Sequence, residues 1–349
     1  MNLFGFRGGV DVKPVIIYPP TVDWDHLHQR PQQLLKALAG CGCLSIFCNL
    51  NTGGKHPPGF ETFSESMLLA NHVDLNSVVD WAKSNYPGHP TIIYFTSPLQ
   101  TREVYSVHAD LVVFDSIDEP VHEFSHWLPD YDYAVKNADL VIASATSLAS
   151  RAGLCRNEEV FLIPNGCEYE HFRLAQAKQP LDEFPFSTGK PILGYIGSIA
   201  TWLDWDLIKA LSHTLKDYEL VLIGSLCQVG KPPVQAPNIH YLGHKDYRDL
   251  PLYLSNFSLC LIPLQINDMT VGVNPIKFWE YLASGIPIVS TPLPEVDKDY
   301  VITVDRANLA DLITGKSQRT REERIALAMT NSWHSRAQKL TEILFRKLN

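Results

Sequence analysis

Short apolar runs alternate with segments of helical character along this chain, and no other feature restricts its fold as much. In the first half the apolar runs cover residues 15–18, 44–48, 91–95, 111–115 and 140–144, and a helical pattern covers residues 30–39. Runs of this length are typical of buried strands. Strands that are separated by helices pair in parallel, because a parallel neighbour requires a long crossover connection. The pattern therefore predicts an α/β fold with parallel sheets.

The alternation stops near the middle of the chain and then begins again. Residues 176–191 contain three prolines, Gly189 and no clear period, which is typical of a linker. Further strands are expected at residues 192–197, 220–223, 239–242, 259–264 and 286–290. We therefore predict two doubly wound, Rossmann-like domains that face a central cleft. They cover residues 1–178 and 192–331, with a linker at residues 179–191.

The end of the chain predicts one more helix, at residues 332–349. Its apolar side chains recur at helical spacing and share one face: Trp333, Ala337, Leu340, Ile343 and Leu344. A helix with such a face needs a surface to cover. We expect it to pack back toward the first domain.

Charge and composition exclude several classes of function. The chain has 349 residues and a net charge of −9, from 29 Lys and Arg against 38 Asp and Glu, with no long basic run. General nucleic-acid binding is therefore not expected. Because no 18 apolar residues run together and the first ten residues do not resemble a signal peptide, we expect a cytoplasmic protein. If it works at a membrane, it lies on the inner surface.

The seven cysteines are scattered, and none has the C-x-x-C spacing of redox or zinc sites. This pattern fits a reducing compartment and mostly buried, inert thiols. We predict no metal site and no cofactor.

The stretch from Val271 to Ser290 carries the densest information about function. It predicts a loop, a short helix, a turn and a core strand. Asn274 is expected to be the N-cap, and Pro275 suits the first helical position. Gly285 is expected to end the helix.

One residue of this helix breaks a local rule. Lys277 is expected in the first turn, where the helix macrodipole disfavours a cation. A cation is useful there if an anion binds the free N–H groups of the same helix end. Glu280 follows on the same face, where a carboxylate can accept hydrogen bonds from a diol. The pair predicts a ligand with phosphates at one end and hydroxyls at the other, such as a nucleotide sugar.

Five segments together resemble the GT-B fold glycosyltransferases of family 4, and the likeness covers nearly the whole chain. The segments are Ile163 to Gly166, Gly194 to Ser198, Asn238 to His244, Asn274 to Ser290, and Trp24 with Gln29 to Gln32. The last of these resembles a bacterial envelope-polysaccharide branch that includes teichuronic-acid-type enzymes. The resemblance implies sugar transfer from a UDP- or GDP-linked donor to a saccharide or lipid-linked acceptor, with retention of configuration and without a metal. Peripheral membrane association is a further expectation.

The resemblance also implies roles for residues of the second domain. The donor-binding residues are expected to be Gly197, Ser198, Gly224, Gly243, His244, Lys245, Gly272, Val273, Asn274, Pro275, Lys277 and Glu280. Lys277 is expected to act in catalysis as well, by stabilising the departing phosphate.

The first domain is expected to bind the acceptor. Asp118 follows a predicted strand and is expected to contact the acceptor or the donor sugar, or else to cap a helix. The expected acceptor-binding residues are Trp24, His28, Arg30, His122 and His126. Aromatic rings stack on sugars, and Arg pairs with phosphate.

Two departures from the family pattern leave alternatives open. The family usually has a second glutamate eight positions before Glu280, and that position is Gly272 here. The loop from Ile199 to Asp206 also lacks the cations that the family tends to have. A sugar-nucleotide epimerase and a non-catalytic nucleotide-sugar-binding protein are therefore the competing hypotheses. A dehydrogenase is poorly supported, because G-x-G-x-x-G is absent.

Overall fold

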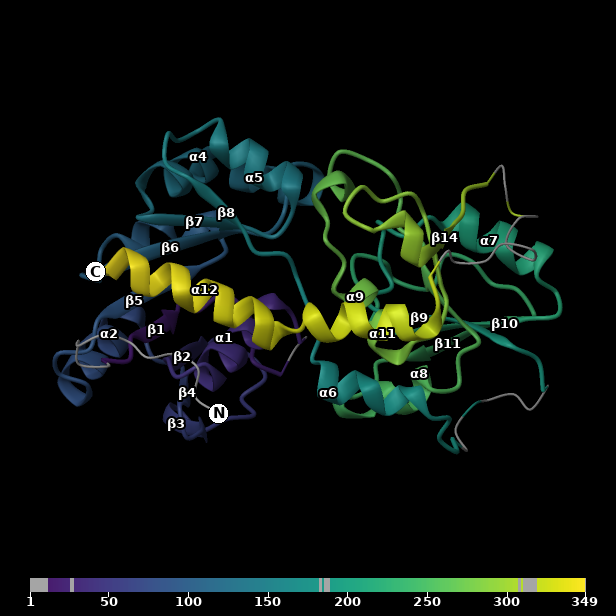
Figure 1. The fold of residues 1–349 in the computed structure, drawn as a ribbon, viewed down its shortest axis with the longest axis horizontal. Coiled ribbons are helices and arrows are strands. Elements are labelled where there is room, and N and C mark those ends of the chain that lie inside the picture. The colour runs from purple at the N-terminus through teal and green to yellow at the C-terminus, as the bar shows by residue number, and fades with distance from the viewer. Residues whose placement is uncertain are drawn as a thin grey trace.

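The fold is that of a computed structural model, which describes residues 12–25, 28–181, 184, 189–306, 309 and 319–348. The first eleven residues and six of the thirteen residues of the predicted linker lie outside this range. The described residues form an eight-stranded sheet followed by a six-stranded sheet. Figure 1 shows the two sheets side by side along the long axis of the molecule, each covered by helices. The predicted α/β class with two Rossmann-like domains is confirmed.

The first sheet has the strand order β3-β4-β2-β1-β5-β6-β7-β8. Its strands are β1 (Val15–Tyr18), β2 (Leu44–Asn49), β3 (Gly59–Ser64), β4 (Met67–Asn71), β5 (Thr91–Phe95), β6 (Leu111–Ser116), β7 (Leu140–Ala143) and β8 (Val160–Leu162). Its helices are α1 (Arg30–Gly40), α2 (Leu75–Asn85), α3 (Thr101–Val104), α4 (Leu128–Asn137) and α5 (Thr146–Gly153). The short helix α6 (Tyr169–Phe172) follows β8 in the chain and packs against α8 and α9 of the second domain. All its pairings are parallel except that of β3 with β4.

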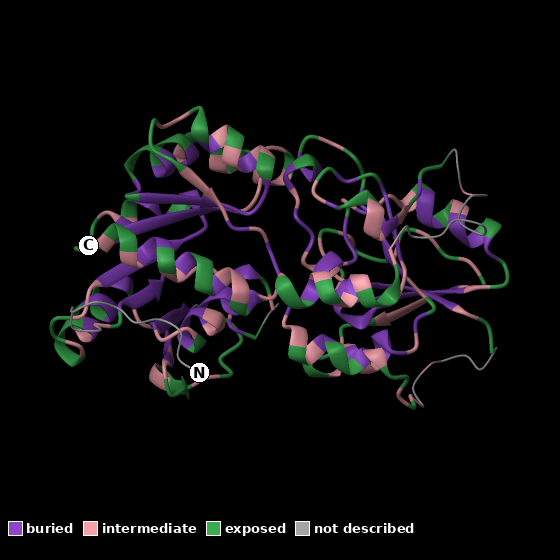
Figure 2. Cartoon of the chain, viewed as in Figure 1, coloured by how far each residue is buried: buried purple, intermediate pink, exposed green. Residues whose placement is uncertain are grey.

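Strand β1 shows why the strands of this sheet are apolar throughout. Ile16 and Tyr18 pack into the cluster on one face of the sheet, and Val15 and Ile17 pack into the cluster on the other. All four side chains are buried. A strand covered by helices on both faces has no solvent-facing positions, so it reads as a continuous apolar run. In Figure 2 the central strands are accordingly buried along their whole length.

The second sheet has the strand order β11-β10-β9-β12-β13-β14, and its described pairings are parallel. Its strands are β9 (Ile192–Ile196), β10 (Glu219–Ile223), β11 (Ile239–Gly243), β12 (Leu259–Ile262), β13 (Ile288–Ser290) and β14 (Val301–Thr303). Its helices are α7 (Trp205–Thr214), α8 (Leu250–Leu254), α9 (Ile276–Ser284) and α11 (Arg321–Thr330). The strand order reverses between β9 and β12. Open α/β sheets bind ligands beyond the carboxyl ends of the strands at such a point.

The last helix, α12 (Trp333–Leu348), leaves the second domain and crosses the first one beside α1 (Figure 1). The predicted apolar face is confirmed, because its side chains are buried in the core of the first domain: Trp333, Ala337, Leu340, Ile343 and Leu344. The segment that leads into α12 lies beside the segment that leaves the first domain. The Trp333 N–H donates to the Cys167 carbonyl at 3.0 Å. A Cβ at Gly166 would lie 2.6 Å from the Asn331 carbonyl oxygen, so only glycine fits there.

Candidate active site

A cavity of about 750 Å³ lies between the two domains and is lined by residues from both. The predicted donor-side residues that line it are Gly197, Ser198, Gly224, His244, Lys245, Val273, Asn274, Pro275, Lys277 and Glu280. From the first domain, Asp118, His28 and Arg30 line it. The cavity lies beyond the ends of β9, β10 and β12, since Ile196, Ile223 and Ile262 also line it. It occupies the place where the strand order predicts a ligand.

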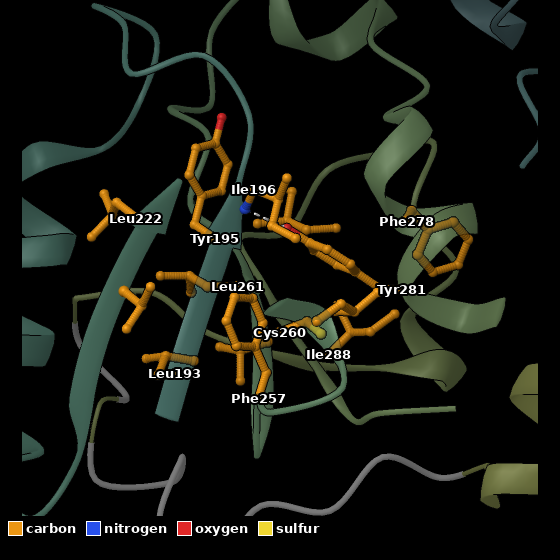
Figure 3. Packing of buried hydrophobic residues seen from close by; sticks show 14 of the residues in the cluster. Leu193, Tyr195, Ile196, Leu222, Phe257, Cys260, Leu261, Phe278, Tyr281 and Ile288 are labelled. Atoms are coloured by element: carbon orange, nitrogen blue, oxygen red, sulfur yellow. Dashed lines mark hydrogen bonds between the residues drawn. The ribbon is translucent and has the colours of Figure 1, made fainter. Parts of the chain in front are cut away.

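Helix α9 begins one residue later than the sequence predicts. Ile276 is its first residue and Pro275 its N-cap, so the expected capping role of Asn274 is wrong. The predicted end is confirmed, because Gly285 has a φ of 74° and its N–H bonds to Leu282. The helix is fixed to the sheet by Tyr281, whose hydroxyl accepts the Ile196 N–H at 2.8 Å. Figure 3 shows this bond between α9 and β9, within the packed core.

Asn274 instead joins the two domains. Its side-chain oxygen accepts the backbone N–H of Asn165 at 3.1 Å and the indole N–H of Trp279 at 2.9 Å. Its carbonyl oxygen accepts the Asn165 side-chain amide at 2.6 Å. Asn165 in turn accepts a hydrogen bond from Arg30 of α1. The entry to α9 is thereby anchored to the first domain.

Lys277 lies directly over the end of β9. A Cβ at Gly197 would lie 1.9 Å from the Lys277 Cε and 2.6 Å from its Nζ, so a side chain at position 197 would displace the lysine from this place. The Lys277 Nζ is 5.9 Å from the centre of the Tyr195 ring. Burial lowers the pKa of Lys277, and the nearby Glu280 carboxylate opposes that shift. No described residue accepts a hydrogen bond from this ammonium group, although it lines the cavity.

Glu280 is one turn further along the same helix face and is only 7% exposed. Burial raises its pKa from 4.5 to about 7, Lys277 opposes the shift, and Glu168 adds to it. None of the described residues donates a hydrogen bond to its carboxylate. A buried carboxylate without donors is costly, and hydroxyl groups of a ligand would satisfy it.

The glycine turns beside Lys277 let two loops approach each other closely. A Cβ at Gly224 would lie 1.9 Å from the Gly197 carbonyl oxygen, so position 224 requires glycine. Gly243 does not line the cavity, contrary to the prediction. Its carbonyl accepts the Gly224 N–H at 2.8 Å, so Gly243 contacts a residue of the cavity wall without lining the cavity itself. His244 and Lys245, the next two residues, do line the cavity.

Gly272 also lies outside the cavity wall, contrary to the prediction. A Cβ there would meet two side chains of the first domain, at 2.8 Å from the Glu119 Cγ and 3.2 Å from the Ser147 Oγ. Glu119 is buried, with Arg151 at 3.4 Å. The side chain that this chain lacks at position 272 would therefore occupy space that the first domain fills.

Asp118 follows β6 and lines the cavity from the side of the first domain. Burial raises its pKa from 3.8 to about 6, and the charges of Asp115 and Glu119 add to the shift. The alternative role as a helix N-cap is wrong, because the next helical turn begins at His122 with Val121 at its N-cap. Its carboxylate faces the cavity rather than a helix end.

Arg30 is not available to a phosphate in the way that we expected. Its guanidinium forms a two-pronged ion pair with Asp115, at 2.6 and 3.1 Å, and is 3% exposed. Tyr94 donates a further hydrogen bond to Asp115. The group touches the cavity, yet three of its five N–H donors are already bonded to Asp115 and Asn165.

Three other predicted acceptor-side residues do not line the cavity. Trp24 is 4% exposed and packs against Phe47 and Phe63, so its ring cannot stack on a sugar. His122 and His126 are exposed and do not line the cavity. His28 does line it, and its ring stacks on Tyr247 with the centroids 4.3 Å apart.

Two cavity residues with structural roles were not predicted individually. Tyr247 follows the predicted base-binding turn by three residues and lines the cavity between the domains. Asn165 belongs to the Pro-Asn-Gly segment, which the sequence marks only by family resemblance. Nothing local in either segment shows its partners, which are far away in the sequence.

The known proteins that this chain resembles include glycosyltransferases. Residues 190–315 match the family described as glycosyl transferases group 1. TuaH of Bacillus subtilis (strain 168), named as a candidate glycosyltransferase of teichuronic acid biosynthesis, is 27% identical over 210 residues. The match covers 54% of this chain and 52% of TuaH, so the chain spans about half the length of that relative.

Solved structures share the fold over nearly the whole chain. Sucrose-phosphate synthase from Thermosynechococcus elongatus superposes with a TM-score of 0.69 at 14% identity, over 96% of this chain and 99% of that one. HepE of Anabaena in complex with UDP-glucose superposes with a TM-score of 0.66 at 16% identity, over 95% and 99%. At such identities the likeness shows the fold alone. The chain thus shares the fold of these structures over nearly its whole length, and residues 190–315 of its second domain match the group 1 glycosyl transferase family.

Proposed function

We propose that the protein is a glycosyltransferase that moves a sugar from a nucleoside-diphosphate sugar, UDP- or GDP-linked, to a saccharide or lipid-linked acceptor. The family match of residues 190–315 supports a transferase rather than an epimerase or a non-catalytic binder. Of the relatives, HepE is described in complex with UDP-glucose, which supports a nucleotide-sugar donor. The name of TuaH supports a role in cell-surface polysaccharide synthesis.

One observation carries this proposal. Lys277 and Glu280 are a half-buried cation and a buried carboxylate on one face of α9, and no described residue forms a hydrogen bond with either of them. A diphosphate next to Lys277 and the free N–H groups of the first helical turn would neutralise the ammonium group. A ribose diol one turn further would hydrogen-bond the Glu280 carboxylate. A single nucleoside-diphosphate sugar satisfies both groups.

The proposed reaction proceeds with retention of configuration. The bond between the anomeric carbon and the diphosphate oxygen breaks, and a bond from that carbon to the acceptor oxygen forms on the same face. The acceptor proton passes to the leaving diphosphate, so no separate base is needed. Lys277 and the helix N–H groups stabilise the charge that gathers on the leaving group. In this proposal they supply that stabilisation without a metal or cofactor.

Asp118 faces the cavity from the opposite domain, and we propose that it contacts the acceptor or the donor sugar. His28 lines the same side and is proposed to lie near the acceptor. Among the described residues, no helix is both long and apolar enough to span a bilayer. We propose that the protein acts in the cytoplasm, at the membrane surface when the acceptor is lipid-linked.

Donor screening followed by a turnover assay tests the proposal. A thermal-shift screen should show stabilisation by UDP, GDP or one of their sugars, because a ligand that binds only the folded state raises stability. The matching nucleotide sugar should then release free nucleotide when a saccharide acceptor is added. Saturable binding without nucleotide release would instead indicate a binding protein, and a changed sugar on an intact donor would indicate an epimerase.

A further inference from the structure

Three aromatic rings from three separate segments form one stack in the wall of the cavity. The Tyr247 ring lies between His28 and His171, with centroid distances of 4.3 and 4.7 Å and interplanar angles of 11° and 15°. Tyr247 follows β11 in the second domain, and His28 precedes α1 in the first. His171 lies in α6, on the segment that connects the two sheets. The stack therefore joins both domains and their connection.

Hydrogen bonds hold the central ring of this stack at both ends. The Tyr247 hydroxyl accepts a hydrogen bond from the Gln33 amide at 2.8 Å and donates one to the Glu168 carboxylate at 3.2 Å. The Nε2 N–H of His171 donates to the Tyr247 carbonyl oxygen at 2.9 Å. Gln33 belongs to α1, so the hydroxyl of a residue in the second domain is bound directly by a helix of the first.

The charges around the stack add a further connection between the domains. Lys36 of α1 lies 3.3 Å from Glu168, the same carboxylate that accepts the Tyr247 hydroxyl. Burial of the Tyr247 hydroxyl raises its pKa well above the ordinary value, so it is present as a neutral donor. Both faces of its ring and its hydroxyl are thus used by protein groups. Tyr247 is not free to stack on a nucleobase, although it lines the cavity.

We propose that Tyr247 is a positioning residue that clasps the two domains together and fixes the turn at residues 243–248 against α1 before any nucleotide binds. This turn carries His244 and Lys245, which line the donor side of the cavity. Because the turn is already ordered in the free protein, a ligand that binds there loses less free energy to the ordering of this loop. The clasp stands on its own contacts, whereas its effect on donor binding rests on the proposed function.

Small-angle scattering of the nucleotide-free protein tests the clasp. Tyr247→Ala removes the ring and the hydroxyl, and we expect a larger radius of gyration while the circular dichroism spectrum stays native. Tyr247→Phe keeps the stack but loses both hydroxyl bonds, so its increase should be smaller. Tyr133→Ala is the matched control, since Tyr133 is a half-exposed tyrosine on α4. Its scattering should equal that of the wild type.

A folded Tyr247→Ala variant with wild-type scattering would overturn the clasp. If that variant does not fold, His28→Ala provides the same test, because it removes one ring of the stack and leaves the second domain unchanged. Calorimetry with UDP then measures the effect on the ligand, and we expect about tenfold weaker binding for Tyr247→Ala. If a variant with a larger radius of gyration bound UDP with wild-type affinity, the ordered turn would not contribute to nucleotide binding. A wild-type protein that binds no nucleotide would refute the proposed function and leave the scattering result standing.

Discussion

Two pairs of charged residues, one on each wall of the cavity, have opposite surroundings. On the wall of the first domain, Arg30 and Asp115 are bonded to each other and to Asn165 and Tyr94. On the wall of the second domain, Lys277 and Glu280 lie in the same cavity without a bond from any described residue. Burial of charge is expensive in both places. The Arg30–Asp115 pair meets that cost with protein partners and is part of the scaffold, whereas we propose that a ligand meets it at Lys277 and Glu280.

The largest expected effect breaks the scaffold side of this comparison. Arg30→Ala leaves the Asp115 carboxylate buried without its cation, and we expect the free energy of unfolding to fall by about 3–5 kcal/mol. Urea denaturation followed by circular dichroism measures it. Arg102→Ala, on the short helix α3, is the control for the loss of an arginine. A wild-type unfolding midpoint for Arg30→Ala would show that the pair is not structural.

The next effect concerns turnover. Lys277→Ala removes the cation that is proposed to stabilise the leaving diphosphate, and we expect kcat to fall by about 100- to 1,000-fold. Donor affinity should fall less, because the charge to be stabilised grows in the transition state. Steady-state kinetics with the donor found by screening separates kcat from KM. An unchanged kcat would remove Lys277 from the mechanism.

Substitution of the carboxylate sharpens the comparison from the ligand side. Glu280→Ala should weaken nucleotide binding by about 2–4 kcal/mol, because two charge-assisted hydrogen bonds to the ribose are lost. Its free energy of unfolding should not fall, since no protein donor loses a partner. Calorimetry and urea denaturation of the same samples measure both quantities. Glu65→Ala, in the exposed turn between β3 and β4, should change neither of them.

The smallest effect is a dependence on pH. Because burial raises the pKa of Glu280 from 4.5 to about 7, the folded protein holds this proton more tightly than the unfolded chain does. Its contribution to stability is therefore fully present below pH 4.5 and is lost as the pH rises to about 7. Donor binding has the opposite sign, because only the ionised carboxylate accepts both ribose hydroxyls.

We therefore expect the affinity for a nucleotide sugar to rise by up to about tenfold between pH 6 and pH 8. Glu280→Gln should bind more weakly at the higher pH and should show a much flatter profile. Calorimetry across this range measures the slope. An equally steep profile in Glu280→Gln would assign the titration to another group.

The sequence predicts those features of this protein that depend on short-range pattern. The parallel strands are recognisable because burial on both faces makes them apolar throughout. Strand β3 was not predicted, since it pairs antiparallel at the sheet edge and much of it is exposed. The parallel strands β4, β8 and β14 were not predicted either, and β8 and β14 have only three residues each. Lys277 and Glu280 could be singled out because a cation in the first helical turn contradicts a local rule.

The acceptor side shows why other predictions failed. Arg30 looks like a free cation in the sequence, but its partner Asp115 is 85 positions away. The sequence suggests that the Trp24 ring is free to stack on a sugar. In the folded sheet this ring packs against Phe47 and Phe63. Whether a polar or aromatic side chain serves a ligand depends on partners brought together by the fold. Local pattern holds no information about them.

The path of α12 has a consequence for exchanging parts between related proteins. Its apolar face completes the core of the first domain, although its residues follow the second domain in the chain. A chimera made with one crossover point near residue 180 would therefore combine a foreign terminal helix with a native core, or the reverse. A second junction near Asn331, whose backbone lies next to Gly166, keeps each core with its own residues. An exchange aimed at the proposed donor specificity should therefore replace the segment between these two junctions and keep the native helix α12.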